Sequence, residues 1–509
     1  MPHSRRHILS AGLGLAGAGL LRAFPSRAAE VRFASDPFTL GVASGYPEPN
    51  AVVLWTRLAP EPLAPGGGMP VDPVEVAWEV GTDEALATVV RRGTTYATPD
   101  WAHSAHVEVT GLEPAHDYWY RFTSGGAQSP VGRTRTAAAR GTQPERFTLA
   151  LAACQHYEQG HYAAYHSIAA DAPDLVVHVG DYIYEGRGLN RVRAHDQPEC
   201  HTLEDYRARY ALYKSDPLLK NAHAAAPWML VHDDHEVVND YAAELSGQGD
   251  PPELFLARRA AAYQAYYEHQ PLPRRLVPFD GRQRLYTSRS FGDLVNVYML
   301  DGRQYRSPQA CSPGPLVEPC AEMLGEQRTM LGAVQEQWLA TSLGASTARW
   351  NLIAQQTLFA HFDQGGSGPT AYWADAWNGY PAARARLVET FVRLKTPNPL
   401  VLSGDIHAFL VNDVNARATD LESPVVATEL VTSSISSQGT SQQTLDTWSA
   451  KNPNVHFARS DRRGYIRGTI DADGLRADLV AVDDATRADS ATHVLASFDV
   501  ESGRPGVVR

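Results

Sequence analysis

From residue 146 onward the chain repeats one pattern, in which a short apolar run is followed by a helical stretch and then by another apolar run. The apolar runs have the length of strands, whereas a stretch such as 254–269 has the length and periodicity of a helix. This alternation predicts an α/β core in which helices cover a largely buried sheet. The predicted strands are 147–151, 175–179, 228–231, 295–300, 350–354 and 399–402.

The preceding residues follow a different pattern. Between residues 37 and 137, short β-type runs at 51–55, 74–80 and 106–109 alternate with turns, which indicates a β-sandwich. The segment from Gly111 to Tyr118 resembles the tyrosine corner of immunoglobulin-like and fibronectin type III domains. Since 509 residues exceed what one compact core holds, we expect an accessory sandwich at 37–137 and a catalytic domain at 146–509.

The first residues have the organisation of an export signal. Arg5 and Arg6 precede a Gly- and Ala-rich apolar stretch, and Ser26-Arg27-Ala28 offers a cleavage site. The alternative is a membrane anchor, but the apolar stretch is short and glycine-rich for a span of about 20 residues. We therefore expect a twin-arginine signal peptide at 1–29, recognition by the twin-arginine export machinery, and a periplasmic or secreted protein.

The net charge of the chain limits the kinds of partner that it is expected to bind. The formal charge of -12 offers no broad basic surface, so nucleic acid is not an expected partner, and phosphate-bearing substrates must be attracted locally. No later segment is long and apolar enough to predict a stable membrane span.

The chain contains 4 cysteines. Cys311 and Cys320 flank a loop rich in proline and glycine, and in an exported protein we expect them to form a disulfide. Cys154 stands at the end of a predicted strand.

Three other predicted strands also run into polar residues. Asp181 follows one strand, Asp234 and His235 follow the next, and Asp405 and His407 follow a third. Because ligands bind beyond the carboxyl ends of strands in open α/β sheets, these side chains should converge. Several carboxylates in one crevice repel each other unless cations compensate their charge, so the pattern predicts a metal site.

Gly180-Asp181, Asp234-His235-Glu236 and Gly404-Asp405-Ile406-His407 resemble the successive blocks of the calcineurin-like metallophosphoesterases. The runs 180–185 and 301–306 narrow the resemblance to the D-type alkaline phosphatase (PhoD-like) branch, which includes enzymes described as phospholipase D. The resemblance covers essentially the whole mature chain. It implies a metallophosphoesterase-like two-sheet α/β core preceded by the sandwich.

The same resemblance implies roles for individual residues. Asp181 would bridge two metals, and Tyr184 would ligate iron. Cys154 would replace the aspartate that opens the generic pattern, and His407 would complete the iron shell. Ferric ion accepts phenolate and carboxylate oxygen, and thiolate and imidazole also bind iron, so this set is chemically sound.

The second ion is where the sequence departs from the generic family. Asp234 stands where an asparagine is usual, and Asp405 stands where a histidine is usual. Carboxylates favour hard, oxygen-loving Ca²⁺ over zinc or manganese, so we expect Fe³⁺ with one or two Ca²⁺ ions. Asn239 is a tentative further ligand, and Glu236 could supply another oxygen. For each residue, helix capping or support of a ligand residue is an equally open alternative.

Two residues are predicted to act on the substrate. His235 would stabilise or protonate the leaving oxygen, while two cations would supply a metal-bound hydroxide and clamp the phosphoryl group. Arg303 would hold a substrate phosphate, or alternatively would form a structural ion pair with Asp301 or another acid. His156 is placed outside the site, as are His161, His166 and His178.

The leading hypothesis is an exported alkaline phosphatase and phosphodiesterase that hydrolyses phosphate mono- and diesters. One alternative is a phospholipase D-type phosphodiesterase. The other is a secreted, metal-stabilised binding protein.

Overall fold

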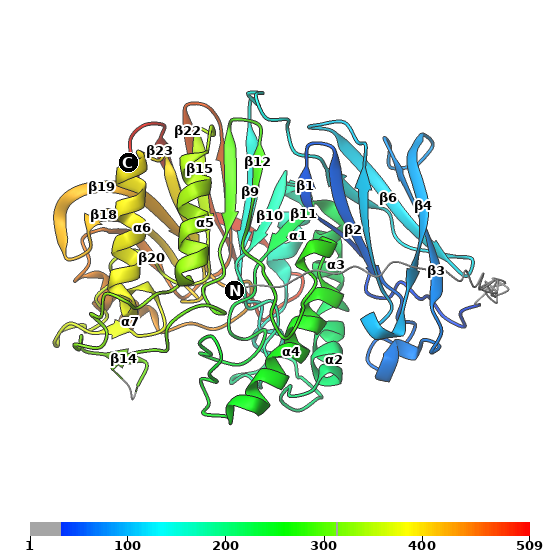
Figure 1. Ribbon diagram of the computed structural model, residues 1–509, viewed down its shortest axis with the longest axis horizontal. Coiled ribbons are helices and arrows are strands. Elements are labelled where there is room, and N and C mark those ends of the chain that lie inside the picture. The colour runs from blue at the N-terminus through cyan, green and yellow to red at the C-terminus, as the bar shows by residue number, and fades with distance from the viewer. Residues whose placement is uncertain (1–31, 312–313, 509) are drawn as a thin grey trace, which may run out of the picture.

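The computed structural model describes residues 32–311 and 314–508, and its centre consists of two packed β-sheets (Figure 1). The first sheet has 9 strands in the order β23-β22-β21-β9-β10-β11-β1-β2-β5, and the second has 7 strands in the order β12-β13-β15-β17-β19-β18-β20. Parallel strands occupy the middle of both sheets. They are β9 (Phe147–Ala152), β10 (Leu175–His178) and β11 (Pro227–Leu230) in the first, and β13 (Val295–Met299), β15 (Trp350–Ala354), β17 (Pro399–Ser403) and β19 (Asp420–Val431) in the second.

One apolar core joins the two sheets. Leu151 and Val177 of the first sheet belong to the same buried cluster as Leu352 and Leu402 of the second. Helices cover the outer faces, as the α/β alternation predicts. They are α1 (Ala163–Asp171), α2 (Leu203–Lys214), α3 (Pro217–Ala225), α4 (Pro252–His269), α5 (Gly332–Gly344), α6 (Pro381–Leu394) and α7 (Gln442–Ser449).

Antiparallel strands complete the two sheets. In the second sheet these are β12 (Thr287–Phe291), β18 (Phe409–Arg417) and β20 (Val455–Arg459). In the first sheet, β21 (Arg463–Ile470), β22 (Gly474–Val482) and β23 (Thr492–Glu501) extend the edge at β9. The fold is therefore the predicted two-sheet α/β core.

The N-terminal β-sandwich is also present, and it shares a sheet with the core. Three of its strands, β1 (Val42–Glu48), β2 (Ala51–Arg57) and β5 (Ser104–Thr110), extend the nine-stranded sheet because β1 pairs in parallel with β11. The opposing sheet, at the end of the molecule away from β18 and α6 in Figure 1, consists of β3 (Val74–Gly81), β4 (Val89–Ala97), β6 (Asp117–Ser124), β7 (Ala127–Gln128) and β8 (Gly132–Arg135).

The tyrosine corner that the sequence indicated is formed. The hydroxyl group of Tyr118 accepts a hydrogen bond of 2.9 Å from the backbone N–H of Glu113. The positions of the domain boundaries at 37–137 and 146–509 stay a prediction, since a continuous sheet crosses between the two parts.

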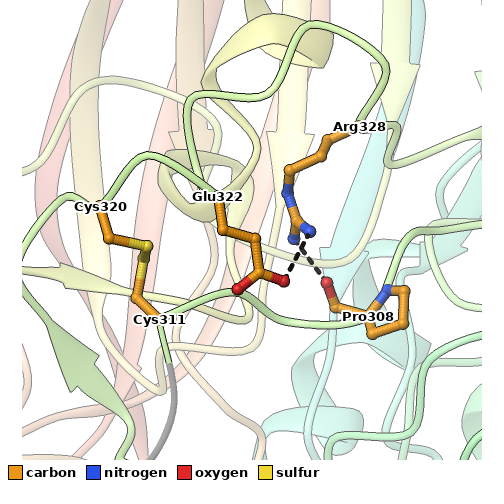
Figure 2. The surroundings of a disulfide bond; sticks show 5 residues. All are labelled: Pro308, Cys311, Cys320, Glu322 and Arg328. Atoms are coloured by element: carbon orange, nitrogen blue, oxygen red, sulfur yellow. Dashed lines mark hydrogen bonds and ion pairs between the residues drawn. A yellow bond between two sulfur atoms is a disulfide. The ribbon is translucent and has the colours of Figure 1, made fainter.

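Cys311 and Cys320 form the expected disulfide, which closes a loop near the second sheet (Figure 2). Within this loop, β14 (Leu316–Val317) pairs with β16 (Tyr372–Trp373). Arg328 donates a hydrogen bond to the Pro308 carbonyl and pairs with Glu322 across the base of the loop. The disulfide loop is therefore joined to the segment that carries Trp373.

The predicted twin-arginine signal at 1–29 lies outside the described residues. Among those that are described, no helix has both the length and the apolar character needed to cross a bilayer.

Candidate metal centre

The carboxyl ends of the central strands bring the predicted ligands together. Cys154 follows β9, Asp181 follows β10, and Asp405 and His407 follow β17. All four residues have left-handed backbone conformations, with φ of 57°, 55°, 65° and 56° respectively. Non-glycine residues adopt this region at a cost that surrounding structure must offset, and such residues cluster at functional sites.

Two glycines allow the strand ends to approach each other. Gly180 has φ of 113°, and a Cβ atom there would lie 2.4 Å from Cβ of Asp233. A Cβ atom at Gly404 would lie 2.8 Å from Cβ of Ala153. Each Gly-Asp pair therefore combines a close backbone contact with a carboxylate at the strand end.

The ligand atoms form two compact groups that share Asp181. Those of Cys154, Asp181 and His407 lie within 4.8 Å of one another, and so do those of Asp181, Asp234 and His235. Oδ1 of Asp181 is buried without a hydrogen-bond partner. A buried carboxylate oxygen without a partner is costly, so its position between the two groups fits a bridging ligand.

Tyr184 lies against the first group. Its hydroxyl group is 2.8 Å from Oδ2 of Asp181 and 3.0 Å from Nε2 of His407, and it accepts a hydrogen bond from Ser437. Nδ1 of His407 lies 2.7 Å from the carbonyl oxygen of Gln438. Because a carbonyl can only accept, that nitrogen donates, which leaves Nε2 of the neutral ring free to bind an ion.

Burial and nearby negative charge disfavour the deprotonated forms of Cys154, Tyr184 and Asp405 when no ion is bound. Burial, together with Asp181, Asp405 and Asp233, raises the pKa of the Cys154 thiol well above its ordinary value. Burial and the nearby Asp181 likewise raise the pKa of Tyr184. The pKa of Asp405 is raised by burial and by Asp233. The donor set therefore fits cations, which would stabilise all of the deprotonated forms at once.

His235 is oriented by a carboxylate that the sequence analysis did not single out. Its Nδ1 lies 2.7 Å from Oε2 of the buried Glu185, and its ring stacks on Tyr184 at 4.2 Å between centroids. Burial disfavours the charged imidazolium, but Glu185 and Asp234 outweigh it and raise the pKa of His235 well above its usual value. Glu185 is the last residue of the run 180–185, which supported the family resemblance, and it directly follows Tyr184.

Glu236 acts on the backbone. Its carboxylate accepts hydrogen bonds from the backbone N–H groups of Asp181, Tyr182 and Asp233, so it ties two strand-end loops together. These hydrogen bonds agree with the supporting role, one of those that the sequence left open for this residue. Asn239 is exposed on the rim of the site, where its tentative ligand role stays a prediction.

Arg303 has the structural role that the sequence left open. Its side chain is fully buried, pairs with Asp233, and lies 2.7 Å from Oδ2 of Asp375. It does not line the cavity described below. These ion pairs are the alternative that the sequence analysis left open, and the role of Arg303 as a phosphate clamp stays a prediction.

A cavity of about 240 Å³ opens at the strand ends. Asp181, Asp234, His235, Asp405 and His407 line it. Gln438, Gly439 and Thr440, from the loop that follows β19, also line it. Ser434, Ser436 and Ser437 of this loop are buried and hydrogen-bonded, so it is ordered next to the site.

His156, which was placed outside the site, stacks on Tyr184 at 4.2 Å between ring centroids. The phenol ring therefore lies between the rings of His156 and His235. The sequence feature that could have placed His156 at the site is its position two residues after Cys154.

A thiol, a phenol, imidazoles and carboxylates gathered at the strand ends of a two-sheet α/β core are the arrangement of a metal-dependent hydrolase. The family model of the PhoD-like phosphatases matches residues 149–479, and that of their N-terminal domain matches residues 25–138. Alkaline phosphatase D of Bacillus subtilis (strain 168) is 44% identical to the chain over 510 residues, covering 98% of this chain and 87% of that protein. A solved structure of PhoD matches with a TM-score of 0.90 at 42% identity and covers 94% of both chains. The chain belongs to the PhoD-like phosphatases.

Family membership confirms the resemblance seen in the sequence. It also favours an enzyme that hydrolyses phosphate esters over the alternative of a metal-stabilised binding protein.

Proposed function

We propose that the protein is an exported phosphatase and phosphodiesterase that works at alkaline pH with one Fe³⁺ and one or two Ca²⁺ ions. The observation that carries this proposal is the position of Asp181, which belongs to both compact groups of ligand atoms and has one oxygen without a hydrogen-bond partner. When bound, a pair of cations would acidify a water molecule and neutralise charge on the phosphoryl oxygens.

The chemistry of the donors supports a different ion in each group. Cys154, Tyr184 and His407 would hold iron together with Asp181, because ferric ion accepts phenolate and thiolate as well as carboxylate. Asp234 and Asp405 would supply the second group with hard oxygen ligands, which favour calcium.

His235 would act on the leaving group. Glu185 binds Nδ1, so Nε2 is the nitrogen left for the cavity that this residue lines. Because Glu185 and Asp234 raise the pKa of His235, they favour an imidazolium that would donate its proton to the departing alcohol oxygen. This supports activity above the pH at which an ordinary histidine loses its proton.

Substitution of His235 tests the proposed role. His235→Ala should lower kcat by roughly 10²- to 10⁴-fold on both a phosphate monoester and a diester, with iron and calcium content unchanged. His166→Ala on the exposed face of α1 is the matched control. Unchanged turnover by a fully metallated His235→Ala protein would exclude His235 as the acid.

Metal analysis of the exported protein tests the ions, and hydrolysis of paired mono- and diesters tests the substrate range, including the phospholipase D-type alternative. Export is tested by replacing Arg5 and Arg6 with lysine, which should retain the protein in the cytoplasm. A colourless, iron-free and fully active preparation would contradict the proposed iron ligands.

A further inference from the structure

The cavity at the strand ends has apolar lining as well as carboxylates and imidazoles. The apolar residues, here called the apolar wall, are Leu358, Trp373, Ala376, Ile406 and Trp448. Trp373, Ile406 and Trp448 are only partly buried, although they pack against a buried apolar cluster. Hydrolysis of a phosphoryl group does not require this wall, and leaving apolar surface in contact with water costs about 25 cal/mol per Å². Apolar surface inside a cavity usually binds a ligand.

Separate contacts hold each of the two tryptophans. Trp373 belongs to β16, which pairs with β14 of the disulfide loop, and its backbone N–H donates a hydrogen bond of 3.0 Å to Gln364. Trp448 belongs to α7 and meets Phe362 edge to face, with 6.3 Å between ring centroids. The backbone of Trp373 and the ring of Trp448 are held by different elements, so the two residues can contribute to a preformed surface.

We infer that Trp373 and Trp448 bind the alcohol part of the substrate and select phosphate esters whose alcohol carries a planar aromatic ring. This inference rests on the proposed function, since it places the phosphoryl group at the carboxylates and imidazoles of the same cavity. Indole faces gain energy from a flat ring through stacking and edge-to-face contacts, whereas a polyhydroxylated alcohol would lose hydrogen bonds to water on this wall.

The size of the cavity sets the scale of the recognised group. A cavity of roughly 150 Å³ is sufficient for benzene. A cavity of about 240 Å³ therefore has room for a phosphoryl group and one ring beside it. Larger alcohols would extend through the mouth of the cavity, so selection acts on the ring nearest to the phosphate.

The test compares two esters whose alcohols have similar acidity, 2-phenylethyl phosphate and propyl phosphate, so that chemistry at the leaving oxygen is matched. The metallated wild-type protein should show a kcat/KM about tenfold higher for the phenylethyl ester. Trp373→Ala and Trp448→Ala should each remove most of this preference by raising KM for the phenylethyl ester. Both should leave kcat/KM for the propyl ester within about twofold of wild type. Trp373→Phe should retain most of the preference, because it keeps an aromatic face.

Inhibition by benzylphosphonate and propylphosphonate adds a measurement that requires no turnover of the compound. Benzylphosphonate should be the tighter inhibitor of the wild type and should lose its advantage in both alanine variants. Trp78→Ala, in the N-terminal sandwich, is the control for removal of an indole elsewhere.

The outcomes separate the inference from the proposed function. Equal kcat/KM for the two esters, or alanine variants that lower both values equally, would overturn the inference while hydrolysis itself stands. Failure of the metallated wild type to hydrolyse either ester would overturn both. Loss of the preference in Trp78→Ala as well would show that the effect is not local to the cavity, which also overturns the inference.

Discussion

The phenolic oxygen of Tyr184 lies 2.8 Å from Oδ2 of Asp181, three positions earlier in the chain. Neither residue is part of a helix or strand, so this contact depends on the turn that follows β10. Asp181 has φ of 55°, and its backbone N–H is bound by Glu236. The turn therefore directs a carboxylate and a phenol into the same space, where Ser437 and His407 complete the surroundings of the phenol.

Tyr184→Phe should remove the phenolate-to-iron band from the visible absorption of the iron-loaded protein while preserving the fold. Phenylalanine keeps the ring between His156 and His235 but lacks the oxygen that would bind iron. Absorption spectra with parallel iron analysis measure the effect. Tyr96→Phe, on an exposed residue of the sandwich, should leave the spectrum unchanged. An undiminished band in Tyr184→Phe would remove this residue from the ligand set.

Iron uptake by the metal-free protein should strengthen as pH rises. The pKa values of Cys154 and Tyr184 are raised, so both are protonated near neutral pH, and binding must release their protons. Titration with ferric ion at several pH values, with proton release recorded in weakly buffered solution, measures this. Cys154→Ser should reduce the release, whereas Cys200→Ala, at a buried thiol that is not among the proposed ligands, should not. Uptake that is independent of pH would contradict the proposed thiolate and phenolate ligands.

Glu185→Gln should lower kcat by about 10- to 100-fold and move the alkaline limb of the pH profile to lower pH. The carboxylate raises the pKa of His235, so its removal lets the imidazole lose its proton at a lower pH. Profiles of kcat against pH for wild type and variant provide the comparison. A lower kcat with an unmoved limb would show that Glu185 only supports the loop.

Lys214→Met should make the protein more stable at neutral pH and flatten its dependence on pH. Lys214 is buried beside Trp55, and burial lowers its pKa well below the ordinary value of 10.5. Between these two pKa values the unfolded chain binds a proton that the folded chain does not, so wild-type stability rises with pH by up to about 1.4 kcal/mol per unit. Denaturant unfolding at several pH values measures the slope. Lys395→Met, at an exposed residue, should retain the wild-type slope.

The double variant Cys311→Ser and Cys320→Ser should loosen the wall that carries Trp373. Without the crosslink, ordering the loop costs more chain entropy, and the backbone N–H of Ala374, which donates to the Pro315 carbonyl at 3.1 Å, should exchange faster. Hydrogen exchange measures this, with the amides of β9 as an internal reference. Equal protection of Ala374 in both proteins would show that the loop is held by its other contacts.

The sequence indicated most of the core because its signals are local. Apolar runs predicted β9, β10, β11, β13, β15 and β17 to within a residue or two but not β19, and the polar residues after the strands indicated Cys154, Asp181, Asp405 and His407. Such local signals could not predict which partners come from distant parts of the chain. Trp373, in the cavity wall, is the last residue of a short strand that no periodic pattern predicts, and Asp375, which pairs with Arg303, follows that strand.

The sequence also did not predict that the sandwich and the core share a sheet. β1 and β11 are separated by well over a hundred residues, and nothing in either strand specifies the other. Strand type is encoded locally, whereas pairing over this distance depends on the assembled tertiary structure.

The order of strands in the nine-stranded sheet also determines when the protein can finish folding. One edge of β9 is covered by β21, which is synthesised much later than β9, while β11 must pair with β1, which is synthesised much earlier. Until β21 has been synthesised, β9 presents an unpaired strand edge that favours aggregation. The sheet is therefore completed only after β21 is available, and pairing between strands far apart in the sequence makes its folding slow.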